Sequence, residues 1–108
     1  MGVKGCPIER TVNILEGKWT LLILRELFTG TKRFGQLRGA LLGVSPKTLA
    51  ERLRILEQQG IISRTIYPEV PPRVEYALTD FGETLSPIIE ALRAWGLQWA
   101  DQVLPVAF

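Results

Sequence analysis

Residues 45–60, SPKTLAERLRILEQQG, carry the clearest helix signals of the chain. Ser45 offers a side-chain oxygen that can cap a helix, and Pro46 occupies the first helical position, where its missing N–H leaves no partner unsatisfied. Gly60 supplies the left-handed residue that commonly ends a helix. Three leucines recur at the spacing of one helix face, and these are Leu49, Leu53 and Leu56. The stretch therefore predicts an amphipathic helix with a buried leucine face.

Three shorter segments before this helix also have helical periodicity. The predicted helices cover residues 7–17, 18–28 and 34–41. The second is apolar over most of its circumference, which predicts a central and buried position. The break Leu42-Gly43-Val44 separates the third helix from the stretch that begins at Ser45. Two short helices joined by a three-residue turn that contains glycine are typical of the helix-turn-helix motif.

A β-hairpin is predicted directly after this motif. Residues 61–67 are rich in β-branched and aromatic side chains, and residues 68–72, PEVPP, block a regular ladder. In the next segment Val74, Tyr76 and Leu78 alternate with Arg73, Glu75 and Ala77. A hairpin in this position is the wing of a winged helix. The predicted fold class is mainly α with a small two-stranded wing, forming one winged helix-turn-helix DNA-binding domain over residues 1–108.

The last predicted helix is more apolar than its own domain requires. Thr79 or Asp80 would cap it, and its apolar side chains recur at spacings of four, three, four, three and four, namely Phe81, Leu85, Ile88, Leu92, Trp95 and Trp99. Left exposed, they would form an apolar patch of the size that marks an interface. The sequence thus predicts a homodimer through the first and last helices, with the interface residues Ile8, Val12, Leu85, Ile88, Leu92, Trp95 and Trp99. The alternative is a self-contained core that uses all of these side chains.

Composition narrows the class of protein. The chain holds one cysteine and no histidine, which excludes an intrachain disulfide and predicts neither a metal centre nor a cofactor. The longest aliphatic run covers residues 21–24, far below the ~18 apolar residues of a membrane-spanning helix. The first six residues lack the apolar segment of a secretory signal. We therefore expect a cytoplasmic protein that does not contact a membrane.

Positive charge gathers in the middle of the chain. The formal net charge is +2, but residues 32–73 hold eight basic and three acidic side chains, so the remainder is net negative. Such asymmetry is typical of a surface that binds phosphate, although a charge cluster is also found on ordinary solvated faces.

The helix over residues 45–60 is predicted to enter the major groove of DNA. With its leucines turned inward, Lys47, Thr48, Glu51, Arg52 and Arg54 are left to face outward, where lysine and arginine can donate to guanine and glutamate can accept from cytosine. The arginines beside the proline tip would reach the minor groove or neighbouring phosphates. The predicted DNA-binding residues are Arg33, Ser45, Pro46, Lys47, Thr48, Glu51, Arg52, Arg64 and Arg73. The alternative is a solvated helix with an ordinary ion pair between Glu51 and Arg54.

Two other classes of function compete with DNA binding. An enzyme with Cys6 as its nucleophile would need a base, yet the chain has no histidine, no glycine-rich phosphate loop and no paired carboxylates, so no enzymatic activity is expected. A winged-helix adaptor that binds protein instead of DNA would use the same apolar surface. Such an adaptor would show no dependence of DNA affinity on salt.

Five ordered motifs resemble those of a known family. They are Cys6-Pro7, Gly17–Leu24, Arg33–Leu37, Ser45–Leu53 and Tyr67–Tyr76. Together they are similar to the HxlR-type winged helix regulators, relatives of the MarR group, from about Cys6 to Trp99. The resemblance implies a dimeric bacterial or archaeal regulator that binds double-stranded DNA near its own or an adjacent promoter. In some members the cysteine before the proline senses electrophiles, oxidants or aldehydes, which implies a small-molecule or oxidant signal at Cys6.

The residues around Cys6 have opposing effects on its thiol. With Pro7 at the first helical position, Cys6 lies at or near the N-cap, where free N–H groups and the helix dipole favour a thiolate, and Lys4 and Arg10 add positive charge. Glu9 acts against this, because its carboxylate competes for the same N–H groups and repels an anion. Redox sensing by Cys6 and simple packing at the head of a helix both remain open.

Overall fold

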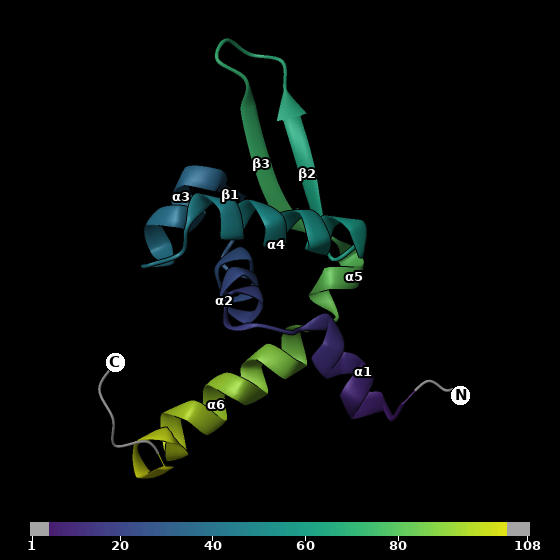
Figure 1. Cartoon of the computed structure of the whole chain (residues 1–108), viewed down its shortest axis with the longest axis vertical. Coiled ribbons are helices and arrows are strands. Elements are labelled where there is room, and N and C mark those ends of the chain that lie inside the picture. The colour runs from purple at the N-terminus through teal and green to yellow at the C-terminus, as the bar shows by residue number, and fades with distance from the viewer. Residues whose placement is uncertain (1–4, 104–108) are drawn as a thin grey trace.

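The computed structural model describes residues 5–103 (Figure 1). Its elements in chain order are α1 (Pro7–Ile14), α2 (Lys18–Leu27), β1 (Lys32–Arg33), α3 (Phe34–Ala40), α4 (Pro46–Gln58), β2 (Ile62–Tyr67), β3 (Arg73–Leu78), α5 (Asp80–Glu83) and α6 (Ser86–Val103). The fold is mainly α with a small wing, as predicted. The first four helices and both predicted strands lie where the periodicity placed them.

The helix-turn-helix core is formed by aliphatic side chains of α2, α3, α4 and the start of β2. The largest fully buried side chains among the described residues are Ile23, Leu24, Leu37, Leu41, Leu49, Leu53, Leu56, Ile61 and Ile62. The predicted inward face of α4 and the central position of α2 are thereby confirmed. At the far end of α4, Gly60 adopts φ +77°, the left-handed conformation that its position required.

The predicted hairpin is confirmed as β2 and β3, and a third strand that was not predicted extends it to a three-stranded antiparallel sheet in the order β1-β3-β2. β2 and β3 pair from Ile62 opposite Leu78 to Tyr67 opposite Arg73. The additional strand, β1, pairs with the start of β3. Two residues have no alternation to detect, and this strand exists only because β3 lies beside it. β1 fastens the base of the hairpin to the body, while the tip extends away from the helices (Figure 1).

The predicted last helix is divided in two, so the prediction of one continuous apolar stripe along it was wrong. Thr79 caps α5 by accepting the N–H of Gly82 at 3.0 Å, and α6 begins only at Ser86. Pro87 explains the break, because proline lacks the N–H that a continuing helix needs and its ring clashes with the preceding turn. Phe81 consequently leaves the stripe and stays 59% exposed on α5.

Helices α1 and α6 leave the body at the end opposite the wing (Figure 1). Neither has a buried residue. The predicted interface side chains on them range from half-buried to exposed: Leu85 and Ile88 pack partly on the core, whereas Ile8, Val12, Leu92, Trp95 and Trp99 are between 42% and 75% exposed. These values exclude a self-contained core that uses all of these side chains. Within residues 5–103, no helix combines the length and the hydropathy needed to cross a membrane.

Candidate nucleic-acid interface

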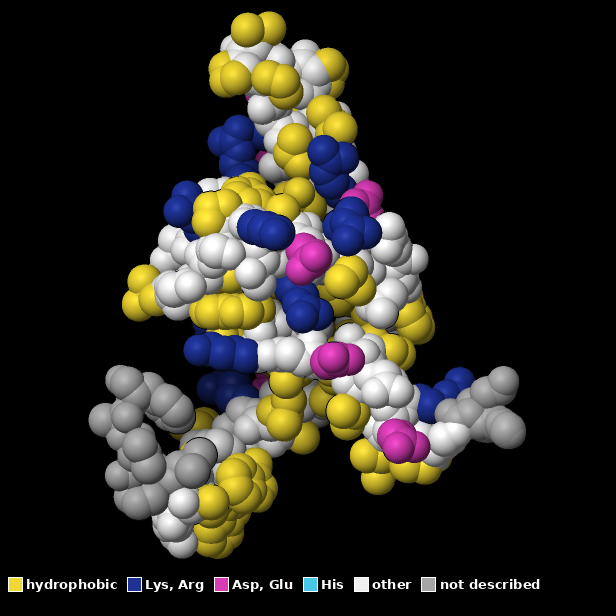
Figure 2. Space-filling view, viewed as in Figure 1, with side chains coloured by type: hydrophobic (Ala, Val, Ile, Leu, Met, Phe, Trp, Pro, Cys, Tyr) yellow, Lys and Arg dark blue, Asp and Glu magenta, His cyan; other side chains and the backbone are white. Residues whose placement is uncertain are grey.

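Basic side chains gather around α4 and the lower half of the wing. Figure 2 shows this face of the molecule, on which Lys and Arg side chains lie above, across and below the outer surface of α4 with acidic side chains among them. The distribution follows from the sequence, because the segment of positive charge at residues 32–73 runs from β1 to β3. The fold therefore gathers a basic segment onto one surface.

The N-terminus of α4 is built by the residues that the sequence identified there. The Ser45 hydroxyl accepts the backbone N–H of Thr48 at 3.1 Å and donates to the Thr48 hydroxyl at 3.0 Å. Pro46 follows at the first helical position, and the side chain of Lys47 is exposed. Ser45, Pro46 and Thr48 thus shape the end of the helix, and Lys47 extends from it.

One outward face of α4 carries Lys47, Glu51 and Arg54. These positions are separated by four and three residues, so they lie on one side of a helix, and all three side chains are exposed. The face lies opposite the buried leucines. Arg54, which the predicted set of DNA-binding residues omitted, therefore belongs to the same surface as Lys47.

Arg52 lies on a different side of α4. Its side chain is half-buried, and its guanidinium carbon would be 3.6 Å from a Cβ built on Gly17, in the turn between α1 and α2. Contrary to the expectation that Arg52 faces outward with Lys47 and Arg54, the structure separates it from them and places its guanidinium near Gly17. A base contact by Arg52 stays a prediction.

Arg54 and Arg64 line a common hollow between α4 and the wing. The hollow has a volume of about 270 Å³, and its other walls are Ala50, Glu57 and Tyr76. Arg64 shares a sheet face with Tyr76 because the two residues are directly paired across β2 and β3. Among residues 5–103, neither arginine forms an ion pair within 4.0 Å. Helix and wing thus each contribute a guanidinium to one concave site.

Arg73 is engaged within the wing itself. Its Nη2 lies 3.0 Å from a Glu69 oxygen, its Nη1 lies 3.0 Å from a Glu75 oxygen, and its guanidinium stacks 4.0 Å from the centre of the Tyr67 ring. Two carboxylates thus compensate its charge, and the network braces the strand ends next to the tip. The predicted DNA contact of Arg73 competes with this structural role and remains untested.

Arg33 is not brought to the hollow. It is the last residue of β1 and pairs with Glu75, whereas Lys32 pairs with Tyr76. Because neighbouring residues of a strand point to opposite faces, Arg33 lies on the other face of the sheet from Arg64. Its backbone N–H donates to the Gln36 side chain at 2.8 Å and so helps to start α3.

Cys6 occupies the predicted N-cap of α1. Its sulfur accepts the backbone N–H of Glu9 at 3.3 Å, and the residue is exposed. The Glu9 carboxylate folds back towards Gly5, where an added Cβ would be 2.8 Å from its oxygen. The Glu9 carboxylate therefore lies beside Gly5, the residue before Cys6, while Lys4 lies outside the described residues.

Apolar side chains of α1 and α6 share a hollow on the far side of the body. It has a volume of about 460 Å³, and Val12, Leu21, Ile88 and Leu92 are among its walls. Ile88 and Leu92 also line a shallow groove along α6 with Trp95, of about 500 Å³. The structure thus brings Val12, Ile88, Leu92 and Trp95 onto one continuous apolar surface. Contact with a second chain there remains a prediction.

Comparison with known proteins places this geometry in context. Residues 14–104 match the HxlR-like helix-turn-helix family. The HTH-type transcriptional regulator sll1512 of Synechocystis sp. is 53% identical over 97 residues, which make up 90% of this chain and 72% of that protein. The redox regulator HypR in its reduced form has a TM-score of 0.88 at 38% identity, over 91% of this chain and 97% of HypR. Diamide-treated YodB from B. subtilis has a TM-score of 0.73 at 37% identity, over 90% of this chain and 97% of YodB.

Proposed function

The chain belongs to the HxlR-like helix-turn-helix family of transcription regulators, and we propose that it binds duplex DNA sequence-specifically as a homodimer. The observation that carries this proposal is the outward face of α4 together with the hollow shared by Arg54 and Arg64. Because its relatives are transcription regulators, we assign the chain a non-enzymatic role in the cytoplasm, with no cofactor.

On this proposal, α4 enters the major groove. Its N-terminal turn, shaped by Ser45 and Pro46, approaches the DNA, and Lys47 and Glu51 face the base edges. Lysine donates to guanine and glutamate accepts from cytosine, so these two residues contribute sequence choice. The contacts predicted for Arg33, Arg52 and Arg73 would be secondary to those of this face.

The hollow between α4 and the wing holds two arginines and the single acidic residue Glu57, a net positive charge that favours a backbone phosphate. A phosphate there would receive hydrogen bonds from the guanidinium groups of both Arg54 and Arg64, each of which can donate in a bidentate manner. Since one arginine belongs to the helix and the other to β2, a single phosphate would join the two elements. Such a contact positions the helix along the groove and contributes affinity that falls with salt.

Affinity measured against salt tests this function. A fluorescently labelled random duplex is titrated with the protein at several salt concentrations, and the same titration is repeated with genomic fragments selected for binding. A DNA-binding regulator gives a negative slope of log affinity against log salt and a tighter complex with the selected fragments. Absence of the slope would favour the protein-binding adaptor.

Dimerisation is proposed through the apolar surface of α1 and α6. Leu92, Trp95 and Trp99 are 51%, 55% and 42% exposed in the single chain, and exposed tryptophans in a continuous apolar patch are typical of an interface. A second copy related by a twofold axis would cover both patches at once. It would also place two α4 helices on successive major grooves, about 34 Å apart.

We further propose that Cys6 makes DNA binding responsive to oxidants. Two structural neighbours, HypR and YodB, are described respectively as a redox regulator and as a diamide-treated protein, and Cys6 is exposed at the N-cap of α1. Because the chain has one cysteine, a disulfide requires the partner's Cys6 or a small thiol. In either case two thiols lose two protons and two electrons, and diamide is reduced to its hydrazine. The product would alter α1, and through it the dimer surface.

A further inference from the structure

The end of the wing exposes apolar side chains. We call residues 68–72, the loop that joins β2 to β3, the wing tip. Val70 is 100% exposed, and the prolines on either side of it are exposed as well, namely Pro68, Pro71 and Pro72. In the view of Figure 2, apolar side chains lie at this end of the wing, and the Lys and Arg side chains lie below it. An apolar cluster at the end of a projecting hairpin is typical of a surface that contacts another molecule.

The wing tip offers no uncompensated positive charge. Residues 66–75 hold one basic side chain, Arg73, and two acidic ones, Glu69 and Glu75, so the segment has a net charge of −1. Both carboxylates pair with the Arg73 guanidinium at 3.0 Å. A segment of this charge is not attracted to phosphates, because Coulomb attraction requires an excess of positive charge. A contact between the wing tip and DNA must therefore be apolar.

The wing tip is braced where it joins the two strands. Arg73 links Glu69 in the tip to Glu75 on β3, and its guanidinium stacks 4.0 Å from the centre of the Tyr67 ring at the end of β2. The Glu69 N–H donates to the Tyr67 carbonyl at 2.7 Å. Each of the three prolines in the tip also fixes its own φ. A tip that is ordered in advance loses little conformational entropy when it makes a contact.

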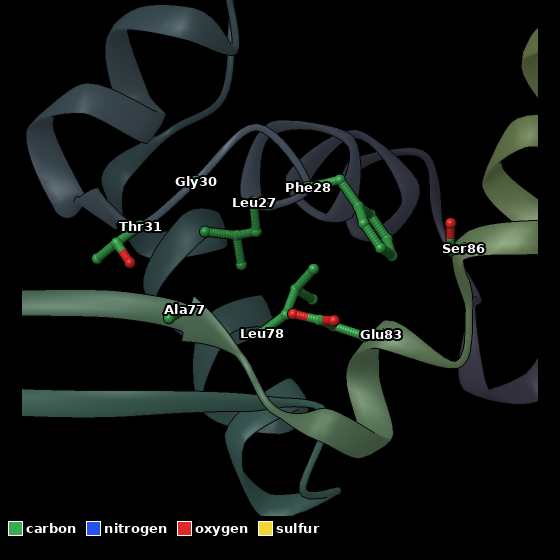
Figure 3. Close-up of a pocket in the computed structure, with 8 residues that line it drawn as sticks. All are labelled: Leu27, Phe28, Gly30, Thr31, Ala77, Leu78, Glu83 and Ser86. Atoms are coloured by element: carbon green, nitrogen blue, oxygen red, sulfur yellow. The ribbon is translucent and has the colours of Figure 1, made fainter.

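The base of the wing is fixed to the body, so the tip has a defined position relative to α4. Leu78, the last residue of β3, points towards the end of α2, where Leu27 lines the same hollow (Figure 3). The Thr79 hydroxyl donates to the Gly60 carbonyl at 2.6 Å, and the Thr79 N–H donates to the Ile61 carbonyl at 3.0 Å. These bonds join the end of β3 to the turn that follows α4.

On the proposed function, this geometry places the wing tip over the minor groove. Arg64 lies three residues before the end of β2, and a strand rises about 3.3 Å per residue, so the tip begins about 10 Å beyond Arg64. If Arg54 and Arg64 hold a phosphate at the edge of the major groove, the tip lies past that strand of the backbone. The neighbouring minor groove is about 6 Å wide, and its walls are deoxyribose rings with apolar C–H groups.

We propose that the wing tip is an apolar wedge that enters this minor groove, with Val70 as its point. An apolar side chain inserted there partly unstacks a base step and bends the duplex. Pyrimidine–purine steps deform at the lowest cost, so the wedge selects sites by how easily they bend, at base pairs to which it donates no hydrogen bond. The inference rests on the proposed DNA binding and adds a specificity-determining residue, Val70, that carries no charge.

Energy transfer between dyes at the two ends of a selected DNA fragment measures the bend in the complex with the full chain. The parent protein is expected to bend the fragment by roughly 20° or more. Val70→Ala should reduce the bend and weaken binding about fivefold, because two methyl groups leave an apolar contact. Its slope of log affinity against log salt should stay parental, since no charge is removed. Val70→Lys should steepen that slope by about 0.9, because it places an ammonium beside the phosphates.

The DNA sequence supplies a second readout of the wedge. Exchange of a TA or CA step in the minor groove next to the α4 site for a stiff A-tract should weaken binding of the parent several-fold and that of Val70→Ala much less. The control Leu97→Ala shortens an apolar side chain that is 78% exposed on α6, away from the wing. It should keep the parental bend, affinity and salt slope.

The possible failures are distinguishable. Parental bend and affinity in Val70→Ala would overturn the proposal, and a parental slope in Val70→Lys would show that the wing tip does not reach DNA. A parent protein that binds with a salt slope but leaves the fragment straight refutes the wedge alone. A chain without salt-dependent DNA binding refutes the proposed function, and the wedge with it.

Discussion

Removal of the Arg64 side chain gives the sharpest test of how the helix and the wing hold DNA. Arg64 and Arg54 both line a hollow of about 270 Å³ that also has Glu57 in its wall, and neither arginine forms an ion pair within 4.0 Å among residues 5–103. Each phosphate that a protein neutralises contributes about 0.9 to the slope of log affinity against log salt. We therefore expect Arg64→Ala to reduce that slope by about 0.9.

The size of this effect is measurable by fluorescence anisotropy. Between about 50 and 200 mM salt, a slope change of about 0.9 alters the affinity ratio by roughly 3.5-fold. Arg64→Lys is the matched control, since it keeps the charge and should keep most of the slope while losing bidentate geometry. Because the two guanidinium groups line one hollow, Arg54→Ala combined with Arg64→Ala should lose less than the sum of the single losses.

Two results would refute this reasoning. If both single alanine variants keep the parental slope, the hollow does not face the DNA and the proposed orientation of α4 is wrong. If the losses add fully, Arg54 and Arg64 contact separate phosphates and the shared clamp is refuted. The comparison on random and selected duplexes is informative as well, because a phosphate contact weakens both equally.

Three further perturbations test the proposed dimer surface, the packing of α5 at Gly82 and the role of the Cys6 thiol. Leu92→Asp should produce monomers in sedimentation and abolish tight DNA binding, because it places an unpaired carboxylate in an apolar contact. The control Ala94→Asp, on the opposite side of α6, should leave the dimer intact. If both variants are monomeric, or both are dimeric, the proposed interface is wrong. Gly82→Ala should lower the free energy of unfolding, measured by urea titration, by about 1–3 kcal/mol, because a backbone oxygen occupies the place of the new Cβ. The control Gly35→Ala, whose Cβ would meet nothing within 4 Å, should be neutral or stabilising. An unchanged stability of Gly82→Ala would show that α5 can move. Diamide with glutathione should change the DNA affinity of the parent protein about tenfold and leave that of Cys6→Ser unaffected. If both proteins respond alike, the proposed role of Cys6 in sensing oxidants is refuted.

Local signals account for most of the elements seen. Ser45 and Pro46 start α4 and Gly60 ends it through chemistry confined to a few neighbouring residues, so the capping pattern could be read directly. The burial of three leucines on α4 followed from their period alone. Cys6 was placed at its N-cap because Pro7 marks the first turn of a helix.

Long-range contacts account for the features that the sequence did not reveal. The short strand β1 becomes a strand only beside β3. The break before α6, in contrast, had a local signal in Pro87, which the apolar spacing outweighed in the prediction. The arginines of the candidate nucleic-acid interface that are free to bind DNA were harder still to predict from the sequence. Arginine is recognisable in a sequence, but whether its charge is available depends on what folds next to it.

Arg64 and Arg73 show why this difference arises. Both lie in the wing and both are equally basic as sequence letters, yet Arg73 is paired with two carboxylates and a tyrosine ring, while Arg64 lines a hollow with Arg54 and Glu57 and forms no ion pair among the described residues. The pairing register of β2 and β3 and the packing of the sheet on α4 determine which partner each guanidinium finds. The class of fold and the family follow from short-range patterns, because helix and turn preferences act over a few residues. The set of charges that can reach DNA follows from contacts between distant segments, which no local pattern encodes.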